Sequence, residues 1–456
     1  MKMIKLITGA MLALGLVSSA RATATFGSTN VVYITGSTAF RAGLFETLTN
    51  NSSTPSVFDV GTPVSNPSGA SSSTSAYYVV GKISGNYVMI SIALTGSEAG
   101  LASLTGTTVT YTPPANSDLS RPSATAVTLA GTPTPTGFKD PLALANTIPG
   151  AAVPDLAFAD TSVAVSLYPN ANLVNHGLVA VIPFVWAKGY SSAPDDGWTN
   201  FLNVTSQTLP VEFNGAQNLA FFTGNPTHTN KVYLIGRNEG SGTRVNTLAD
   251  QFVQNAYGVV KQYVASTAGY TNGILTLGDK TQPIVTNRLV NGTSGVHLLS
   301  VGGDGFDAGS GVIGTLYADT ATAGLYTLGY SGLGDATSLR NNTYATIGGG
   351  GQLLTVDGVP ENDGNVVSGA YHMWGHEYLY GNTATASDTT VTAVANALAG
   401  TTVNTTCIGF STTGSASAAH ANLGGATASA RSLFINPALM HAERPSGSDY
   451  GFLGRF

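Results

Sequence analysis

The chain has 456 residues, of which 43% are hydrophobic and only 9% are charged, and its formal net charge is −6. This composition excludes a disordered chain, which would be poor in apolar residues, and a nucleic-acid-binding protein, which needs a basic stripe. The single cysteine, Cys407, excludes an internal disulfide. A neutral, hydroxyl-rich surface is expected, which offers little charge repulsion against self-association.

The N-terminus has the layout of a secretory signal peptide. Lys2 and Lys5 precede the apolar residues 6–17, and Ala22-Thr23-Ala24 fits the cleavage site that follows small residues. The apolar run is shorter than the roughly 20 residues that a membrane-spanning helix needs. We therefore expect residues 1–24 to be removed and the mature protein to be periplasmic or secreted. A buried N-terminal helix is the less favoured interpretation.

Strands and helices are predicted to alternate along the mature chain, which favours an α/β fold with mixed sheets. Three units consist of a strand, a turn of glycine, serine and threonine, and a helix. Residues 106–150 are interpreted as an irregular β excursion and 258–320 as an inserted segment. The expected elements are strand 31–34, helix 39–49, strands 76–82 and 87–94, helix 98–105, strands 156–159, 178–186 and 231–236, helix 244–257, strand 325–330 and helix 391–399.

The third of these units carries the strongest local signal for a binding site. Arg237 ends a strand, Gly240-Ser241-Gly242-Thr243 forms the turn, and a helix follows. Glycines expose backbone N–H groups, the start of a helix attracts an anion, and arginine can bind two oxygens at once. Glu239 can hold Arg237 in place, and Arg244 adds a second positive charge. Taken alone, the segment fits an anion cradle and an ordinary helix N-cap with an ion-paired arginine equally well.

Six segments, in the same order along the chain, resemble the periplasmic phosphate-binding proteins of ABC transporters. The segment that begins at Arg237, R-N-E-G-S-G-T, resembles the family's R-x-D-x-S-G-T. The other segments are Ile34–Phe40, Thr95–Leu101, Asp155–Asp160, 178–186 and Tyr371–Tyr380. The resemblance implies a two-lobe periplasmic-binding-protein type II fold with β-rich insertions. It implies residues 25–175 and 325–382 as lobe 1, 176–324 as lobe 2 with the insertion 258–320, and 383–456 as a C-terminal extension.

The resemblance also implies a site and a function. In that family each lobe supplies half of a desolvated oxyanion site. Asp160 would accept a hydrogen bond from a ligand that still carries a proton, and so select phosphate over sulfate. The implied protein is a solute-binding protein, without enzymatic activity or cofactor, that passes phosphate or a related oxyanion to ABC-transporter membrane subunits. The site residues carried over by motif are Thr38, Phe40 through its backbone N–H, Ser97, Asp160, Arg237, Ser241, Gly242 and Thr243, supported by Ser37, Glu239 and Arg244.

Departures from the family pattern keep a second hypothesis open. Ala39 stands where threonine is usual, Arg41 where proline is usual, Glu98 where a small residue is usual, and Glu239 where aspartate is usual. With the Thr-, Gly- and Ala-rich tail, these changes are also compatible with an extracellular surface, adhesion or self-assembling protein whose anion site is weakened or lost. A phosphate-ester hydrolase, the third hypothesis, lacks a visible nucleophile or metal cluster.

The metal motifs are weaker than the anion motif. Residues 302–307 match one copy of a calcium-binding nonapeptide, but that motif works as a stacked array, so a glycine-rich loop is expected. His372 and His376 could share a helix face beside Glu377, yet zinc needs a third ligand, so core packing is expected. We also expect a flexible loop at 348–351 and a small buried side chain at Cys407.

Overall fold

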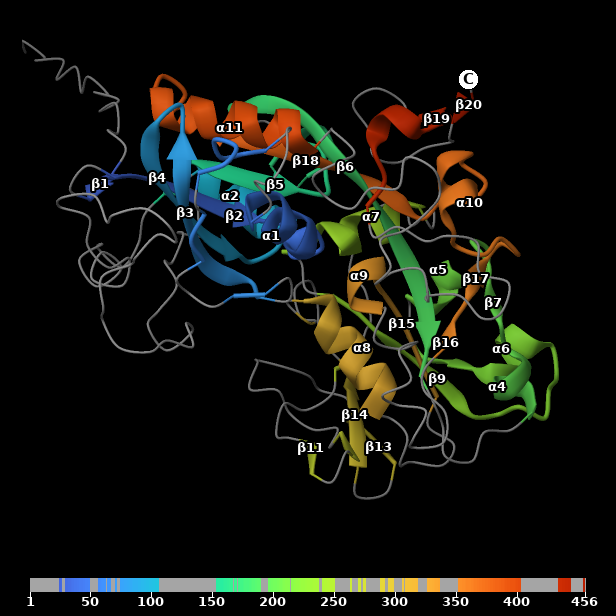
Figure 1. Cartoon of the computed structure of the whole chain (residues 1–456). Helices are drawn as coiled ribbons and strands as arrows, with labels where there is room; N and C mark the ends of the chain where they lie inside the picture. Colours follow the sequence, from blue (N-terminus) through green and yellow to red (C-terminus); the bar gives the residue numbers. More distant parts are fainter. Residues whose placement is uncertain are drawn as a thin grey trace, which may run out of the picture.

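The computed structural model has a mixed α/β fold, which confirms the predicted fold class. It describes residues 24–105, 153–250 and 352–402 with short gaps, parts of 263–336, and the segments 434–443 and 454–455. Most of the described strands form one large mixed sheet that runs through two bodies of the molecule, and three strand pairs lie outside it (Figure 1). The two bodies are called the first and the second half of the sheet.

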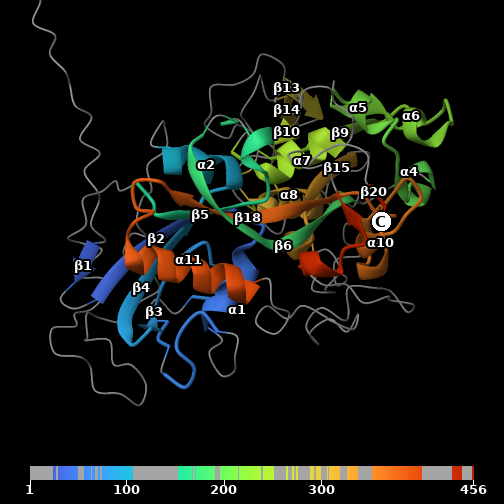
Figure 2. The same ribbon diagram turned by 90° about the horizontal axis from the view of Figure 1, so that it is seen from above.

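The first half of the sheet contains, in spatial order, β3 (Ala76–Ile83), β4 (Asn86–Leu94), β2 (Thr29–Gly36), β5 (Leu156–Ala159) and β18 (Trp374–Asn382). Strand β2 is parallel to β4 and β5, so the carboxyl ends of these strands lie at the same edge. Helix α2 (Ser97–Thr105) covers one face, and helices α1 (Arg41–Thr49) and α11 (Thr389–Thr402) cover the other (Figure 2).

The second half contains, in spatial order, β15 (Tyr326–Gly332), β9 (Lys231–Ile235), β10 (Tyr263–Val264), β14 (Ser294–Leu298) and β13 (Arg288–Asn291). Strands β15 and β9 are parallel. Helix α8 (Gly309–Ala318) packs against β15, and helix α7 (Gly242–Asp250) contacts both β15 and β18. Helix α7 therefore lies where the two halves meet.

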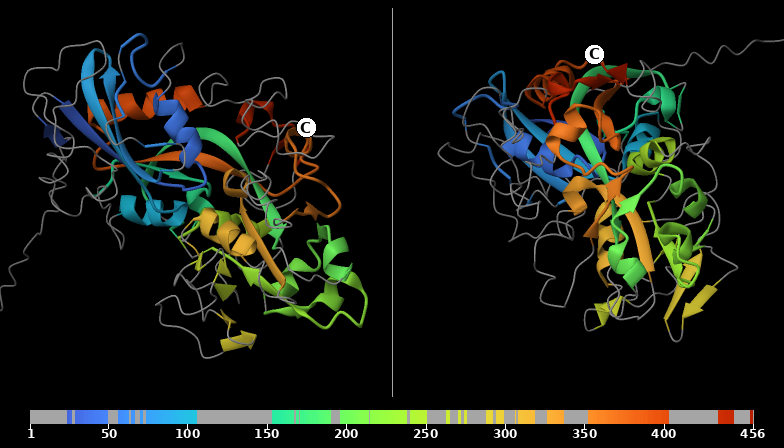
Figure 3. Two further views of the ribbon diagram at one scale, coloured as in Figure 1. Left: turned by 60° about the horizontal axis from the view of Figure 1, so that its bottom comes forward. Right: turned by 90° about the vertical axis from the view of Figure 1, so that its right-hand side faces the viewer.

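A single long strand, β6 (Leu173–Lys188), joins the two halves. Its residues 173–183 pair with β18, and its residues 184–188 pair with β15. Figure 3 shows this strand passing from one half into the other. Its apolar stretch from Val179 to Ala187 is almost fully buried, as expected for a strand covered on both faces.

The remaining elements are short and surround the two halves. The extra strands are β1 (Ala24–Phe26), β7 (Asn203–Val204), β8 (Gln217–Asn218), β11 (Tyr270–Thr271), β12 (Ile274–Leu275), β16 (Gln352–Leu353), β17 (Thr355–Val356), β19 (Ala442–Glu443) and β20 (Gly454–Arg455). The extra helices are α4 (Asp196–Asn200), α5 (Leu209–Glu212), α6 (Leu219–Thr223), α9 (Leu333–Ala336) and α10 (Asp363–Val367), with 3-10 turns at Val163–Val165 and Pro437–Leu439.

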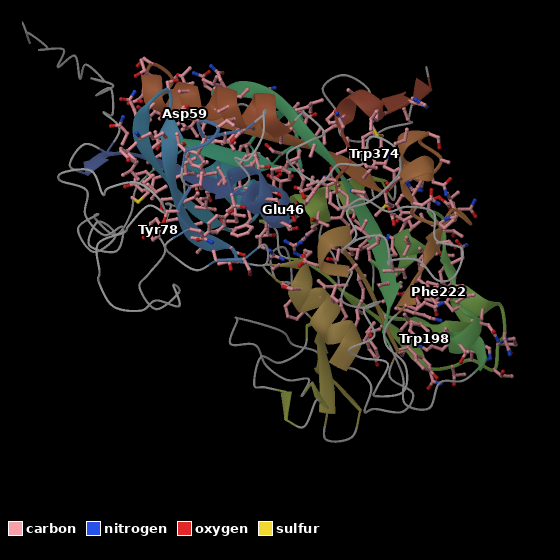
Figure 4. The ribbon with its side chains drawn as sticks, viewed as in Figure 1. Glu46, Asp59, Tyr78, Trp198, Phe222 and Trp374 are labelled. Carbon is pink, nitrogen blue, oxygen red and sulfur yellow. The ribbon has the colours of Figure 1, made fainter. Side chains whose placement is uncertain are left out.

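The hairpin between β3 and β4 shows how local sequence fixes the geometry. Ser84 and Gly85 both have positive φ, at 52° and 79°, as two-residue hairpin turns require. The carboxylate of Asp59 accepts the backbone N–H of Ser84 at 2.9 Å and that of Gly85 at 2.8 Å. Asp59 therefore holds the turn from outside the hairpin, and Figure 4 labels it beside these strands.

The structure differs from the expected division of the chain at two places. Strand β15 pairs with β9 and with the last residues of β6, so residues 326–332 belong to the second half and not with lobe 1. Helix α11, expected within a C-terminal extension, packs on β6 and β2 as part of the first half. In both cases the partner strand is distant in sequence, and a local pattern cannot identify it. The remaining domain boundaries stay a prediction.

Several sequence predictions fall outside the described residues. They are the signal peptide up to residue 23, the β excursion at 106–150, the loop at 348–351, Cys407, and the calcium-like motif 302–307 apart from Phe306. In the part of the chain that the structure describes, no helix is both long and apolar enough to cross a membrane.

His372 and His376 do not share a helix face, and His376 packs among aromatic rings as expected. His376 lies on β18, where its ring packs between Trp374 and Tyr378, and His372 precedes that strand. The Nε2 atom of His372 lies 3.2 Å from Oδ2 of Asp357. The described residues contain no group of three side chains suited to hold a metal ion.

Candidate anion site

The predicted site residues lie at the carboxyl ends of strands from both halves. Thr38 follows β2, Ser97 lies shortly after β4, and Asp160 comes directly after β5. Arg237 follows β9 of the second half. Open α/β sheets commonly bind ligands at this edge. The four side chains are between 1% and 5% exposed, so any ligand here would be largely desolvated.

A chain of hydrogen bonds connects these residues. The Arg237 guanidinium donates from Nη2 to Oγ1 of Thr38 at 3.3 Å and from Nη1 to Oγ1 of Thr243 at 3.4 Å. The Thr243 hydroxyl donates to Oδ2 of Asp160 at 3.3 Å, and the Ser97 hydroxyl donates to Oδ1 at 2.5 Å. The two halves are thus joined through the very side chains that the sequence singled out.

The Asp160 carboxylate is the centre of this arrangement. Burial raises its pKa, while the Ser97 hydroxyl, the charge of Arg237 and the Thr243 hydroxyl act in the opposite direction. Gly242 packs so closely that an added Cβ would overlap with Oδ1 of Asp160. We call the group formed by Thr38, Ser97, Arg237 and Thr243 the cradle. The Asp160 carboxylate lies within it as an oxyanion supplied by the protein itself, with a hydroxyl donor on each of its oxygens.

The backbone around Asp160 is held as firmly as its side chain. Its N–H donates to Oγ of Ser97 at 3.1 Å, so that hydroxyl is both donor and acceptor toward the same residue. Its carbonyl oxygen accepts the Nδ2 amide of Asn246 on α7 at 2.5 Å. These bonds fix the direction in which the carboxylate points.

The turn before α7 also contacts the start of α2 in the other half. The carbonyl oxygen of Gly240 accepts the backbone N–H groups of Glu98 at 3.1 Å and Ala99 at 3.4 Å. Gly96 has a φ of +119°, and an added Cβ there would overlap with the Gly240 carbonyl oxygen. A protein carbonyl, therefore, satisfies the first amides of α2, which have no partner within their helix.

Glu98 does not project into the cradle as an unpaired charge. Its side chain is 1% exposed, and its Oε1 accepts the Thr161 hydroxyl at 2.7 Å. Its position in the first turn of α2 also suits a negative charge. Arg41, a second departure from the family pattern, forms an ion pair with Asp335 on α9 at 2.6 Å, which is another link between the halves.

Some expected residues play a different part. The backbone N–H of Phe40, expected to face the ligand, donates to Oγ of Ser37 at 3.3 Å in a local turn. Ser241 uses its Oγ to accept the backbone N–H of Arg244 at 3.3 Å, at the start of α7. Nη1 of Arg244 lies 3.5 Å from the carbonyl oxygen of Arg237, so Arg244 borders the cradle from behind. Glu239 lies outside the described residues.

Sequence reasoning missed other members of the site. The Phe306 carbonyl accepts Nε of Arg237 at 3.1 Å, and the Tyr330 hydroxyl accepts its backbone N–H at 3.3 Å. Asn246 and the buried Glu377 approach Asp160 from α7 and β18. No local signal marks these residues, except that Glu377 lies within a segment already noted for its resemblance.

A separate cavity of about 460 Å³ lies in the second half, away from the candidate anion site. It is bordered by the rings of Phe201 and Phe222 and by polar side chains that include Asn203, Thr223 and His228. Figure 4 shows Phe222 near Trp198 in this outer region. No predicted site residue borders it.

Comparisons with known proteins agree with the expected resemblance. The chain is similar to three solved structures of phosphate transport proteins. One, from Clostridium perfringens and solved with bound phosphate, is assigned as a phosphate ABC transporter substrate-binding protein; it has 12% identity and a TM-score of 0.41, over 82% of this chain and 93% of the other.

An ABC-type phosphate transport receptor from Vibrio cholerae has 11% identity and a TM-score of 0.37, over 80% and 93% of the two chains. PstS from Borrelia burgdorferi has 14% identity and a TM-score of 0.33, over 81% and 92%. No protein-family model matches the sequence, and no curated protein matches it. At these identities and TM-scores the likeness assigns neither a role nor a ligand to this chain, and the site is therefore judged on its own geometry.

Proposed function

We propose that the chain is a solute-binding protein that takes up inorganic phosphate, or a related oxyanion that still carries a proton, between the two halves of its sheet. One observation carries this proposal. Hydroxyl donors from both halves, Ser97 and Thr243, converge on an oxyanion, the Asp160 carboxylate, in a buried site, and the Arg237 guanidinium donates to the neighbouring Thr38 and Thr243 hydroxyls. The donor set therefore already has the chemistry that a phosphate requires.

Phosphate would enter this site by exchange of hydrogen bonds. Its oxygens take over the hydroxyls of Ser97 and Thr243 and the guanidinium of Arg237. Its own O–H is donated to Asp160, so the carboxylate keeps a donor after it loses the two hydroxyls. Sulfate brings no proton and would leave Asp160 facing a negative charge without a donor. The exchange thus favours phosphate over sulfate.

Removal of the Arg237 guanidinium tests this function. We expect Arg237→Ala to weaken phosphate binding by at least about 100-fold, because a buried charge-assisted contact is lost. Isothermal calorimetry at fixed pH, with sulfate as a second ligand, measures the effect. Lys82→Ala removes a cation on β3 that lies over the Tyr87 ring, away from the site residues, and is expected to bind phosphate like the wild type. Equal binding by wild type and Arg237→Ala would remove the proposal.

Export and delivery form the finer part of the proposal. We infer that residues 1–24 are removed on secretion and that the loaded protein docks on the membrane subunits of an ABC transporter. N-terminal sequencing of the exported protein tests the first point, because a mature chain that retains Met1 would contradict it. Loss of phosphate uptake on deletion of the chain, restored by the wild type but not by Arg237→Ala, tests the second.

A self-assembling surface protein is the second candidate function, and one observation favours it. The donors of the cradle are engaged by the chain's own groups, since Gly240 caps α2 and Asp160 occupies both hydroxyls. Such a cradle can serve as a clamp between the halves without any ligand. Electron microscopy and size-exclusion chromatography at high concentration distinguish the functions: filaments without phosphate binding favour assembly, and a monodisperse monomer counts against it.

A further inference from the structure

Glu377 is a second carboxyl group at the floor of the candidate anion site. Strand β18 runs antiparallel to β5, and Tyr378 pairs with Ala159. Glu377 therefore lies across from Asp160, the residue that follows β5. On its other side Glu377 pairs with Ala180 of β6, in the interior of the sheet. Its side chain is fully buried.

The Glu377 carboxyl lacks the charged partner that would stabilise its negative charge. Neither oxygen forms a hydrogen bond of standard geometry with any described residue. Burial, and then the charge of Asp160, raise the pKa of Glu377 well above its usual range, and the nearby Ser37 hydroxyl opposes this only in part. An ionised carboxylate without partners is costly in such surroundings, whereas the protonated form is not.

The groups around the two carboxyls decide which one carries the proton. Asp160 accepts two hydroxyls and lies near the positive charge of Arg237, so the negative charge is stabilised there. The elements packed against β18 also carry two buried charged residues, Glu98 on α2 and Arg244 on α7, but the groups that shift the pKa of Glu377 are the Asp160 carboxylate and the Ser37 hydroxyl. On β18 itself, His376 packs between aromatic rings. The proton of the pair therefore belongs on Glu377.

We propose that Asp160 and Glu377 form a carboxyl pair that holds one proton, and that the site accepts an oxyanion only while this proton is present. The inference rests on the proposed function and names a residue that controls it. With the proton on Glu377, one negative charge faces the ligand, and the ligand's own O–H is donated to Asp160. Without that proton, two adjacent carboxylates face an anion. Glu377 thus acts on the ligand through Asp160, as a positioning residue.

Glutamine at position 377 imitates the protonated carboxyl at every pH, which makes Glu377→Gln the informative variant. Calorimetry with inorganic phosphate from pH 5.5 to 8.5 gives the ratio of the wild-type to the variant dissociation constant, and this ratio cancels the ionisation of phosphate itself. We expect the ratio to rise once the pH passes the raised pKa of Glu377, by about tenfold for each further pH unit, since affinity requires a retained proton. The carboxyl pair would be overturned by a ratio that stays constant in the pH range where the stability difference between wild type and Glu377→Gln has levelled off.

Glu212→Gln is the matched control. Glu212, on α5 in the second half, is also fully buried, and burial raises its pKa well above the usual range. Glu212→Gln should change the pH dependence of unfolding. The ratio of the wild-type to the Glu212→Gln dissociation constant for phosphate should, however, stay the same at every pH. If Glu212→Gln changed the pH dependence of phosphate affinity as Glu377→Gln does, the effect would belong to buried acids in general, and the inference about Glu377 would be wrong.

A second measurement separates the carboxyl pair from the proposed function. The folded pKa of Glu377 is raised, so the folded chain holds a proton that the unfolded chain releases, and stability falls as pH rises above the unfolded value. Urea unfolding should therefore show the wild type losing stability relative to Glu377→Gln between pH 5.5 and 8.5. If the wild type does not bind phosphate in calorimetry, the proposed function is refuted. If the stabilities of the wild type and Glu377→Gln depend on pH in the same way, the carboxyl pair is refuted.

Discussion

Asp160 occupies the place in which a small oxyanion would be bound. Its two oxygens accept the hydroxyls of Ser97 and Thr243, and a phosphate can take over these donors only if it offers its own proton in return. Gly242 makes the close approach possible because any side chain would overlap with the carboxylate. The residues at 160 and 242 are therefore constrained jointly.

A methyl group at position 242 tests this constraint. We expect Gly242→Ala to lower the free energy of unfolding by about 1–3 kcal/mol and to abolish phosphate binding, because the new Cβ overlaps with Asp160. Gly400→Ala is the control: Gly400 is exposed on α11 with open space around it, so alanine there should raise stability by up to about 1 kcal/mol. Urea unfolding and calorimetry measure both effects, and equal stabilities would contradict the expectation.

At the scale of elements, local patterns predicted what borders the site. The strand expected at 31–34 lies within β2, and the strand expected at 231–236 is β9, which ends one residue earlier. The helices expected at 39–49, 98–105 and 391–399 are present as α1, α2 and α11. Helices α4, α5 and α6 were missed because each is about one turn long and has no measurable period.

Contacts between distant elements could not be predicted in the same way. The position of Glu377 opposite Asp160 depends on the register of two strands more than 200 residues apart, and no local period encodes that register. The cap on α2 by Gly240 is another such contact. Phe40 is the opposite case, because the neighbouring Ser37 competes locally for the N–H that was predicted to face a ligand.

Lys188 at the end of β6 holds the short helix α4. Its Nζ donates to the carbonyl oxygens of Trp198 at 2.6 Å, Thr199 at 3.2 Å and Phe201 at 2.7 Å. Such a cation suits the carboxyl end of a helix. Burial nevertheless lowers the pKa of Lys188 to about 8, so its charge is less favourable in the folded protein than in the unfolded chain.

This shift predicts a pH dependence of stability. Between pH 8 and the unfolded value of about 10.4, the unfolded chain binds more protons than the folded one, so the stability contribution of Lys188 rises with pH. Relative to Lys188→Met, the wild type should gain about 1–2 kcal/mol in free energy of unfolding from pH 7.5 to 10, after allowance for partial solvation. Urea unfolding of both proteins measures this, and parallel pH profiles would show that the shift is absent.

At the scale of the whole molecule, the two halves meet through polar contacts at the candidate site. Gly240 reaches α2, Arg237 reaches Thr38, and Arg41 pairs with Asp335. Each contact joins the first half to a turn or helix of the second. The site is therefore also the interface on which the relative position of the halves depends.

We expect Gly96→Ala to separate the halves, because its Cβ would overlap with the Gly240 carbonyl. Small-angle X-ray scattering should show a larger radius of gyration than for the wild type. Gly177→Ala is matched for backbone strain, since Gly177 has a φ of +108° but open space around it, and it should keep the wild-type dimension. An unchanged radius for Gly96→Ala would show that this contact does not hold the halves together.

The long strand β6 leaves no point at which the molecule can be divided cleanly. If the chain were cut next to β6, either β18 or β15 would lose β6 as its hydrogen-bonded neighbour. Each fragment, produced separately, would carry a bare strand edge and tend to aggregate. The two halves therefore cannot be produced as independent domains, because they share strand β6. Truncated versions of the protein should keep residues 173–188 intact.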